Sequence, residues 1–366
     1  MPKKVKKRLS QKRIAVDLGV SQTLVSMVLN GRTEGIAKDS YDRIWSYALE
    51  NGYSPRGMKL EAGMPGGMAM GMETVGYILR APLRLANKSN FFSHVHQGLH
   101  DYLTENWAKT VFLGSEDLIQ PKDLEQFRRV RKSMHGLVIM GEMDSKLVEK
   151  LADIFPKVVY LSASLPGVCH SVSGNDVEAA EQLVEHLVDY GHEHFAWLGG
   201  SPGTKRNLNR LNAVKSALAK RGLSLPDERQ VITNSDGADW REGHGCAEKI
   251  LALKTGPRPT AWICLNALMA RGAINALLRN GLQVAKDVSV AAIDCTRVRE
   301  SEWPTLTASA AQPEEMGRLA AKLILDDAES SYFQDIVVPA TFFKGESTGP
   351  VSSVDGNSSQ PLERVS

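Results

Sequence analysis

The sequence is poor in the features that mark secreted and membrane proteins. Its four cysteines are scattered, with spacings that match neither a zinc site nor a disulfide framework: Cys169, Cys246, Cys264 and Cys295. Apolar runs all fall short of the roughly 18 residues of a membrane span. The basic N-terminus is not followed by the apolar segment of a secretory signal. We therefore expect a cytoplasmic protein with reduced thiols and no membrane contact.

Sequence motifs typical of enzymes are equally scarce. The segment GGSPG at 199–203 follows a predicted strand, but it lacks the Lys-Ser/Thr of a phosphate-binding loop and a clean dinucleotide fingerprint. No serine or cysteine lies in a nucleophile elbow. His186, His192 and His194 lie close together in sequence, and such histidines are more often structural than metal ligands. We predict a protein that is not an enzyme and that uses no cofactor or metal.

Charge is distributed unevenly along the 366 residues. Residues 1–59 carry twelve Lys and Arg against five Asp and Glu, whereas the remainder carries 32 against 37. A basic head on an acidic body favours contact of the head with a polyanion, although solvated basic segments are common. Charge alone therefore suggests nucleic acid without establishing it.

The first sixty residues predict three short helices. Ser10 can cap a helix that runs to Asp17, and Gly19 suits a tight turn with positive φ. Ser21 can cap a second helix to about Leu29, and a third spans roughly 38–51. This pattern is a helix-turn-helix, whose second helix enters the DNA major groove. A generic three-helix bundle is the alternative, but the turn and the exposed polar start of the second helix favour DNA binding.

A linker and a large α/β body follow. Residues 56–72 are rich in Gly and Met, which favours a flexible tether over a hinge helix. Apolar segments then alternate with amphipathic helices, which predicts parallel sheets covered on both faces, two rather than one. The strand candidates are 74–79, 110–113, 136–140, 157–161, 194–198, 230–233, 260–265 and 288–293. Residues 349–366 have the composition of a disordered tail and lack leucine heptads for a tetramer.

These motifs together resemble the LacI/GalR family of bacterial repressors over nearly the whole chain. The segments that carry the resemblance are IA at 14–15, LGVS at 18–21, VLNG at 28–31, NGYSP at 51–55, SNFF at 89–92, YGH at 190–192, LGG at 198–200, DVSV at 287–290 and EST at 346–348. The resemblance implies an all-α helix-turn-helix head over 1–55 and the linker over 56–72. It further implies an α/β, two-lobed periplasmic-binding-protein-like domain with parallel sheets over 73–348, which binds effector and dimerises, before the tail at 349–366.

The resemblance also implies which residues contact DNA. Gln22, Thr23 and Met27 would face bases. Met27 stands where the family usually has Arg, so the operator should differ from the common half-site at that position. Leu60 is the candidate wedge for the minor groove. The full predicted set is Ser21, Gln22, Thr23, Ser26, Met27, Asn30 and Leu60, of which Ser26 and Asn30 match positions that contact the DNA backbone.

An effector cleft is implied in the body, with chemically suitable residues at Phe91, Arg210, Trp240, Asn266, Asp294 and Gln312. The chain departs from the family pattern because Ala267 and Cys295 replace carboxylates. Asn175-Asp176 also inverts the usual order, and Lys344 replaces Arg. A pocket with fewer acidic groups suits a polyhydroxylated sugar less clearly. We still expect a carbohydrate or a related polar metabolite.

The sequence thus predicts a bacterial, nucleoid-associated regulator, acting as a repressor. It would bind a palindromic double-stranded DNA operator as a homodimer, under the control of a small-molecule effector. Three alternatives remain. These are a DNA-binding regulator whose cleft binds no ligand, a solute-binding protein of a transporter, and an α/β enzyme with a DNA-binding head.

Overall fold

The computed structural model describes residues 10–29, 36–37, 40, 43–44, 47, 73–80, 91–201, 204–233, 238–254, 256–294, 296, 303–326 and 332–351. The chain divides into two compact units, Met1–Met70 and Gly71–Ser366. The predicted third helix is described only at Ser40, Arg43, Ile44 and Tyr47, all of which are helical. The predicted linker at 56–72 and most of the predicted tail lie outside the described residues.

The first unit contains the two helices of the predicted helix-turn-helix, α1 (Gln11–Leu18) and α2 (Gln22–Leu29). Ser10 caps α1, and its hydroxyl accepts a hydrogen bond from the Arg13 backbone N–H at 3.2 Å. Gly19 has a φ of 68°, the left-handed conformation that the sequence predicted for this turn. The predicted Ser21 cap is present as well, since its Oγ accepts from Leu24 N at 3.1 Å. The two helices pack on a small core of Ile14, Ala15, Val25, Val28 and Ile44.

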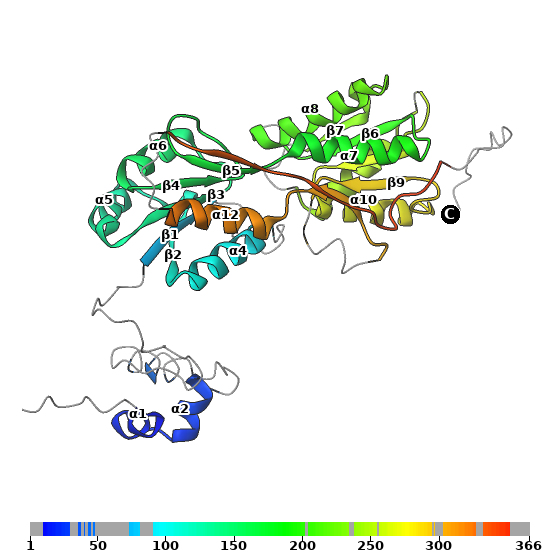
Figure 1. Ribbon diagram of the computed structural model, residues 1–366. Helices are drawn as coiled ribbons and strands as arrows, with labels where there is room; N and C mark the ends of the chain where they lie inside the picture. The colour runs from blue at the N-terminus through cyan, green and yellow to red at the C-terminus, as the bar shows by residue number, and fades with distance from the viewer. Residues whose placement is uncertain are drawn as a thin grey trace, which may run out of the picture. The chain divides into compact units, whose positions relative to one another are not determined.

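The second unit consists of two lobes, each built on a six-stranded sheet (Figure 1). The first sheet has the order β11-β5-β4-β3-β1-β2 and is parallel throughout. Its strands are β1 (Glu73–Leu79), β2 (Ala108–Ser115), β3 (Gly136–Met140), β4 (Val158–Leu161), β5 (His170–Gly174) and β11 (Asp335–Val338). Its helices are α4 (Phe91–Glu105), α5 (Pro121–Val130), α6 (Ser145–Ile154) and α12 (Pro313–Leu325).

The second sheet has the order β12-β10-β9-β8-β6-β7, and only β12 runs antiparallel to its neighbour. Its strands are β6 (Phe195–Gly199), β7 (Gln230–Ile232), β8 (Ala261–Cys264), β9 (Ser289–Ala292), β10 (Thr307–Ala310) and β12 (Thr341–Phe343). Its helices are α7 (Asp176–Asp189), α8 (Lys205–Lys220), α9 (Trp240–Leu251) and α10 (Ala267–Arg279). Short 3-10 turns lie at Glu116–Leu118, Arg131–Ser133 and Asp227–Arg229. The predicted fold class of two parallel-dominated sheets is confirmed.

Successive side chains along a strand point to opposite faces of the sheet, so the first lobe has an apolar core on each face. In β3, Leu137 and Ile139 join one apolar cluster, with α5 and α6, while Val138 and Met140 join the other, with α4 and α12. All five residues of β3 are buried, as expected for a parallel strand covered on both sides. In the part of the chain that the structure describes, every helix is too short or too polar to cross a bilayer.

The chain passes between the lobes three times. It leaves the first sheet through β5 and enters α7, returns from β10 into α12, and passes again from β11 to β12. Figure 1 shows these three crossovers side by side between the sheets. Because the crossovers join the same two lobes at one place, they form the hinge about which the lobes can move.

Each lobe contains one helix pair in close contact through glycines. In the second lobe, a methyl group added to Gly243 of α9 would overlap the carbonyl oxygen of Met269 in α10, and one on Gly272 would overlap that of Trp240. Gly98 and Gly317 bring α4 and α12 together in the same way in the first lobe. The approach of the two backbones in each pair therefore depends on the missing Cβ atoms.

Two glycines on α9 provide a matched test of this packing. Gly243→Ala should lower the free energy of unfolding by about 1–3 kcal/mol, because the two helices must separate to admit the methyl group. Gly245→Ala should raise it by about 0.5–1 kcal/mol, because its Cβ would meet nothing within 4 Å. Urea unfolding monitored by circular dichroism measures both. Equal effects of the two substitutions would contradict the close approach.

Candidate functional site

A cavity of about 160 Å³ lies between the lobes. The first lobe contributes Arg80, Phe91 and Phe92, and the second contributes residues at the carboxyl ends of its strands and at the start of α8. Four of the six predicted effector residues line this cavity together: Phe91, Arg210, Asn266 and Asp294. The position agrees with the general rule that ligands of α/β folds bind beyond the carboxyl ends of parallel strands.

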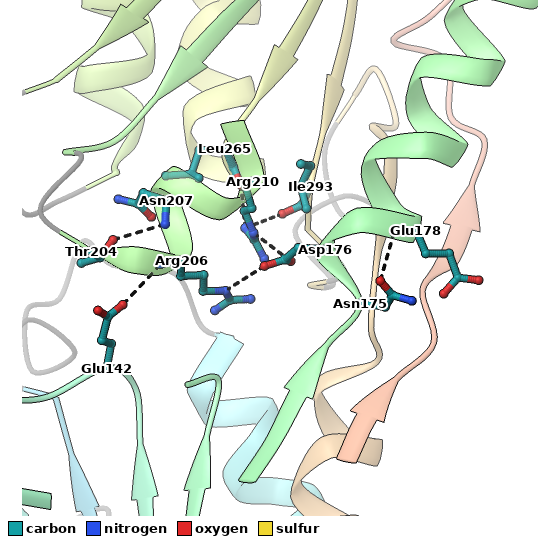
Figure 2. Close-up of polar contacts among 10 residues, drawn as sticks. All are labelled: Glu142, Asn175, Asp176, Glu178, Thr204, Arg206, Asn207, Arg210, Leu265 and Ile293. Carbon is teal, nitrogen blue, oxygen red and sulfur yellow. Dashed lines mark hydrogen bonds and ion pairs between the residues drawn. The ribbon is translucent and has the colours of Figure 1, made fainter. Parts of the chain in front are cut away.

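Arg210 and Asp294 are the two buried charged residues of the cavity, and Nε and Nη1 of Arg210 donate to the protein itself (Figure 2). Its Nε donates to Asp176 Oδ1 at 3.0 Å, and its Nη1 donates to the carbonyl oxygens of Leu265 at 2.7 Å and Ile293 at 2.8 Å. Leu265 follows β8 and Ile293 follows β9. A single guanidinium therefore holds the ends of two strands against the first residue of α7.

Arg206 lies one helical turn before Arg210 and faces the same carboxylate (Figure 2). Its Nε is 3.7 Å from Asp176 Oδ2, and its Cζ lies 5.0 Å from the centre of the Phe91 ring. Burial, followed by the neighbouring charge of Arg210, lowers the pKa of the Arg206 guanidinium to about 10, so it stays charged at neutral pH. Sequence reasoning missed Arg206, although two arginines at i and i+4 on one helix were a visible signal.

Asp294 and Asn266 line the cavity, but both are also structural. Asp294 accepts from the backbone N–H of Ala267 at 3.1 Å through Oδ2 and from that of Thr296 at 2.7 Å through Oδ1. Asn266 is the N-cap of α10, where its Oδ1 accepts from Met269 N at 2.9 Å. The acceptor atoms of both side chains are thus already used by the protein.

The remaining two predicted effector residues are not among those that line this cavity. Trp240 is the first residue of α9, is 45% exposed, and lies 5.7 Å from the guanidinium carbon of Arg241. Gln312 precedes α12 in the second crossover and makes no capping hydrogen bond there. Both were predicted from the family resemblance, Trp240 as a side chain that could stack on a ligand and Gln312 as a donor and acceptor.

A larger cavity of about 740 Å³ adjoins the first, and Arg206 lines both. It lies between α8 and the first lobe, and nine of its twenty lining residues carry a hydroxyl or an amide, among them Ser162, Ser164, Ser173, Asn175, Asn209, Asn212 and Ser216. Glu142, which comes shortly after β3, bridges the lobes at its edge (Figure 2). Its carboxylate accepts from the backbone N–H groups of Lys205 at 3.0 Å and Arg206 at 3.4 Å, so it occupies the positive end of α8.

The predicted DNA-contacting residues are described only in part. Ser21, Gln22 and Thr23 are exposed at the start of α2, and Ser26 and Met27 are half-buried. Asn30 and Leu60 lie outside the described residues. The exposed first turn carries a hydroxyl and an amide that are free to meet base edges, which is the chemistry expected of a recognition helix.

Two of the three clustered histidines bind protein groups. The two ring nitrogens of His192 lie 2.9 Å from Thr260 Oγ1 and 2.9 Å from Ser289 Oγ. Its burial lowers the pKa of the imidazole, which therefore stays neutral at pH 7. His186 Nε2 is 2.8 Å from Thr348 Oγ1. His192 Nε2 also lies 3.1 Å from the carbonyl oxygen of Gly349, so both histidines tie the C-terminal end of the body to the second lobe, a structural role.

Comparison with known proteins agrees with this architecture. Residues 184–348 match the family model described as a periplasmic binding protein-like domain. The chain is 25% identical over 324 residues to the HTH-type transcriptional repressor PurR of Aliivibrio fischeri strain MJ11, covering 86% of this chain and 90% of the relative. It is 23% identical over 347 residues to the HTH-type transcriptional repressor MelR of Bacillus subtilis strain 168, covering 92% and 97%.

Solved structures show the same fold. A transcriptional regulator CelR–cellobiose complex superimposes with a TM-score of 0.64 at 20% identity, covering 93% of this chain and 100% of the other. The lac repressor dimer bound to operator and the anti-inducer ONPF gives a TM-score of 0.64 at 19% identity, covering 93% and 99%.

The fold and the matched model define a chain with a periplasmic-binding-protein-like body. Its resemblance to the LacI/GalR family of transcriptional regulators is confirmed by the repressors among its relatives and by its structural neighbours. Because those relatives are repressors, the prediction that the chain is not an enzyme is confirmed as well.

The contacts of Arg210 generate a stability prediction. Arg210→Met should lower the free energy of unfolding by about 3–5 kcal/mol, because the half-buried Asp176 carboxylate and two strand-end carbonyls all lose the buried donor that they share. Arg221→Met is the matched control, since it removes an exposed pair with Glu185 at the other end of α8. The control substitution should lower the free energy of unfolding by no more than about 1 kcal/mol. Chemical denaturation compares the two, and a loss for Arg210→Met as small as the control's would contradict its structural role.

Proposed function

We propose that this chain is a sequence-specific transcriptional repressor that binds a palindromic operator as a homodimer and responds to a small polar effector. The observation that carries the proposal is the exposed first turn of α2, set behind the left-handed turn at Gly19, in a chain that also contains a two-lobed body. Together these are a DNA-reading element and a ligand-binding element.

In the proposed complex the start of α2 meets base edges in the major groove. Gln22 offers both a donor and an acceptor, the pair needed for a bidentate contact to adenine. Thr23 offers a hydroxyl and a methyl group. Met27 has no donor, so this position cannot select guanine in the way an arginine would. Two such helices related by a two-fold axis require two half-sites of matching symmetry.

Control by the effector is proposed to act through the hinge. A ligand between the lobes changes their relative orientation, and in a dimer this changes the spacing of the two heads. The resulting coupling free energy between effector and operator is typically about 1–3 kcal/mol. The effector is proposed to be a carbohydrate or related polar metabolite. Support comes from the structural neighbour solved with cellobiose. A cytoplasmic, nucleoid-associated location fits this function.

The proposal is tested by selecting bound duplexes from a random pool, with and without candidate sugars and metabolites. We expect an enriched site with two-fold symmetry, whose recovery changes when the effector is added. Enrichment that ignores every metabolite would favour a regulator whose cleft binds no ligand. Failure to prefer any duplex sequence would contradict the proposed function itself.

Two substitutions separate base reading from phosphate contact. Gln22→Ala should relax the preference at one position of the half-site by about 1–3 kcal/mol, because it removes a base contact. Lys12→Ala removes an exposed charge of α1 and should weaken binding to all duplexes about equally. Fluorescence anisotropy with operators that vary at single positions measures both effects. A uniform loss for both variants would contradict the role of Gln22.

A further inference from the structure

The interlobe cavity has an unusual balance of charge. Three guanidinium groups line it, from Arg80, Arg206 and Arg210, against the single carboxylate of Asp294. A pocket for a neutral polyhydroxylated sugar needs acceptors as well as donors, because each hydroxyl both donates and accepts. The lining here is rich in donors.

The acceptors near the cavity are also largely used by the protein. Both carboxylate oxygens of Asp294 accept from backbone N–H groups, and the amide oxygen of Asn266 caps α10. Asp176 is bound to Arg210 at 3.0 Å. Glu142 is held by the first two N–H groups of α8. A ligand in the cavity therefore finds few acceptors that are not already engaged.

Arg206 is a donor of this cavity that remains available. In the described part of the chain its guanidinium makes no hydrogen bond, because Asp176 Oδ2 lies 3.7 Å from its Nε, while Oδ1 of the same carboxylate accepts from Arg210. The Phe91 ring packs against the guanidinium at 5.0 Å and orients it, while 26% of the side chain stays exposed. Since Glu142 already occupies the N-terminus of α8, an incoming anion would meet the side chain of Arg206 and not the helix end.

We propose that the effector carries an oxyanion, a carboxylate or a phosphate, which binds the Arg206 guanidinium. The planar fork of Arg206 matches either group in a bidentate geometry. The hydroxylated remainder of the effector lies in the adjoining 740 Å³ cavity, where serine and asparagine side chains offer both donors and acceptors. This inference rests on the proposed effector-controlled function and narrows its ligand to an acidic or phosphorylated sugar-like metabolite.

Three probes that differ only at one carbon test the inference: glucose, glucuronate and glucose 6-phosphate. Isothermal titration of the full chain should give an affinity for at least one of the two anions about tenfold or more above that for glucose. Preference for glucuronate identifies a carboxylate as the bound group, and preference for glucose 6-phosphate identifies a phosphate. Equal affinity for all three probes, or no binding of either anion, overturns the inference.

Variants of Arg206 locate the interaction. Arg206→Gln should lower the anion affinity about tenfold and leave the affinity for glucose unchanged. Arg206→Lys keeps the charge but loses the planar fork of donors. Its anion affinity should therefore lie between those of Arg206→Gln and the unaltered chain. Arg221→Gln, which removes the same charge at the far end of α8, should bind all probes as the unaltered chain does. If Arg206→Gln and Arg206→Lys both keep the full anion affinity, the inference is wrong.

Operator binding measured on the same samples separates this inference from the proposed function. Selective operator binding without a preference for anions overturns the inference alone. Loss of all duplex preference in the unaltered chain would instead overturn the function on which it rests.

Discussion

The buried guanidinium of Arg210 is the contact on which the geometry of the cleft depends. It joins three elements that are distant in sequence, because its donors reach the first residue of α7 and the residues that directly follow β8 and β9. A buried charge is tolerated only when its hydrogen bonds are satisfied, so these three acceptors must stay together. The wall of the cavity in the second lobe is therefore fixed before any ligand arrives.

The same contact connects the wall to the hinge. Asp176 is the first residue of α7 and follows directly on the crossover from β5, so the carboxylate that faces both arginines belongs to the hinge segment. Glu142 joins the lobes from the other side of the larger cavity through the first turn of α8. A ligand that engages Arg206 would thus act between the hinge segment and the Glu142 link that joins the lobes, which is where a small displacement most directly changes the angle between the lobes.

Local patterns predicted much of the fold. The caps at Ser10 and Ser21 and the turn at Gly19 depend on contacts within four residues, and the structure contains all three. All eight strands predicted from apolar runs are present. The four that were missed are β5, β10, β11 and β12. Of these, β10 has the sequence TASA and is buried without a large apolar side chain, so it carries no periodic signal. Such strands form because the crossovers bring them against the sheets.

The residues that line the cavity were likewise predicted only in part. The family resemblance, supported by residue chemistry, predicted Phe91, Arg210, Asn266 and Asp294 as neighbours. It did not reveal Arg206, and it included Trp240 and Gln312, which are not among the lining residues. The sequence by itself determined the order of elements, the helix-turn-helix and the two-lobed class, because caps, turns and alternation act over short distances. Only the tertiary structure decided which polar atoms of the cleft are already bound, because those partners lie up to 83 positions away in the chain.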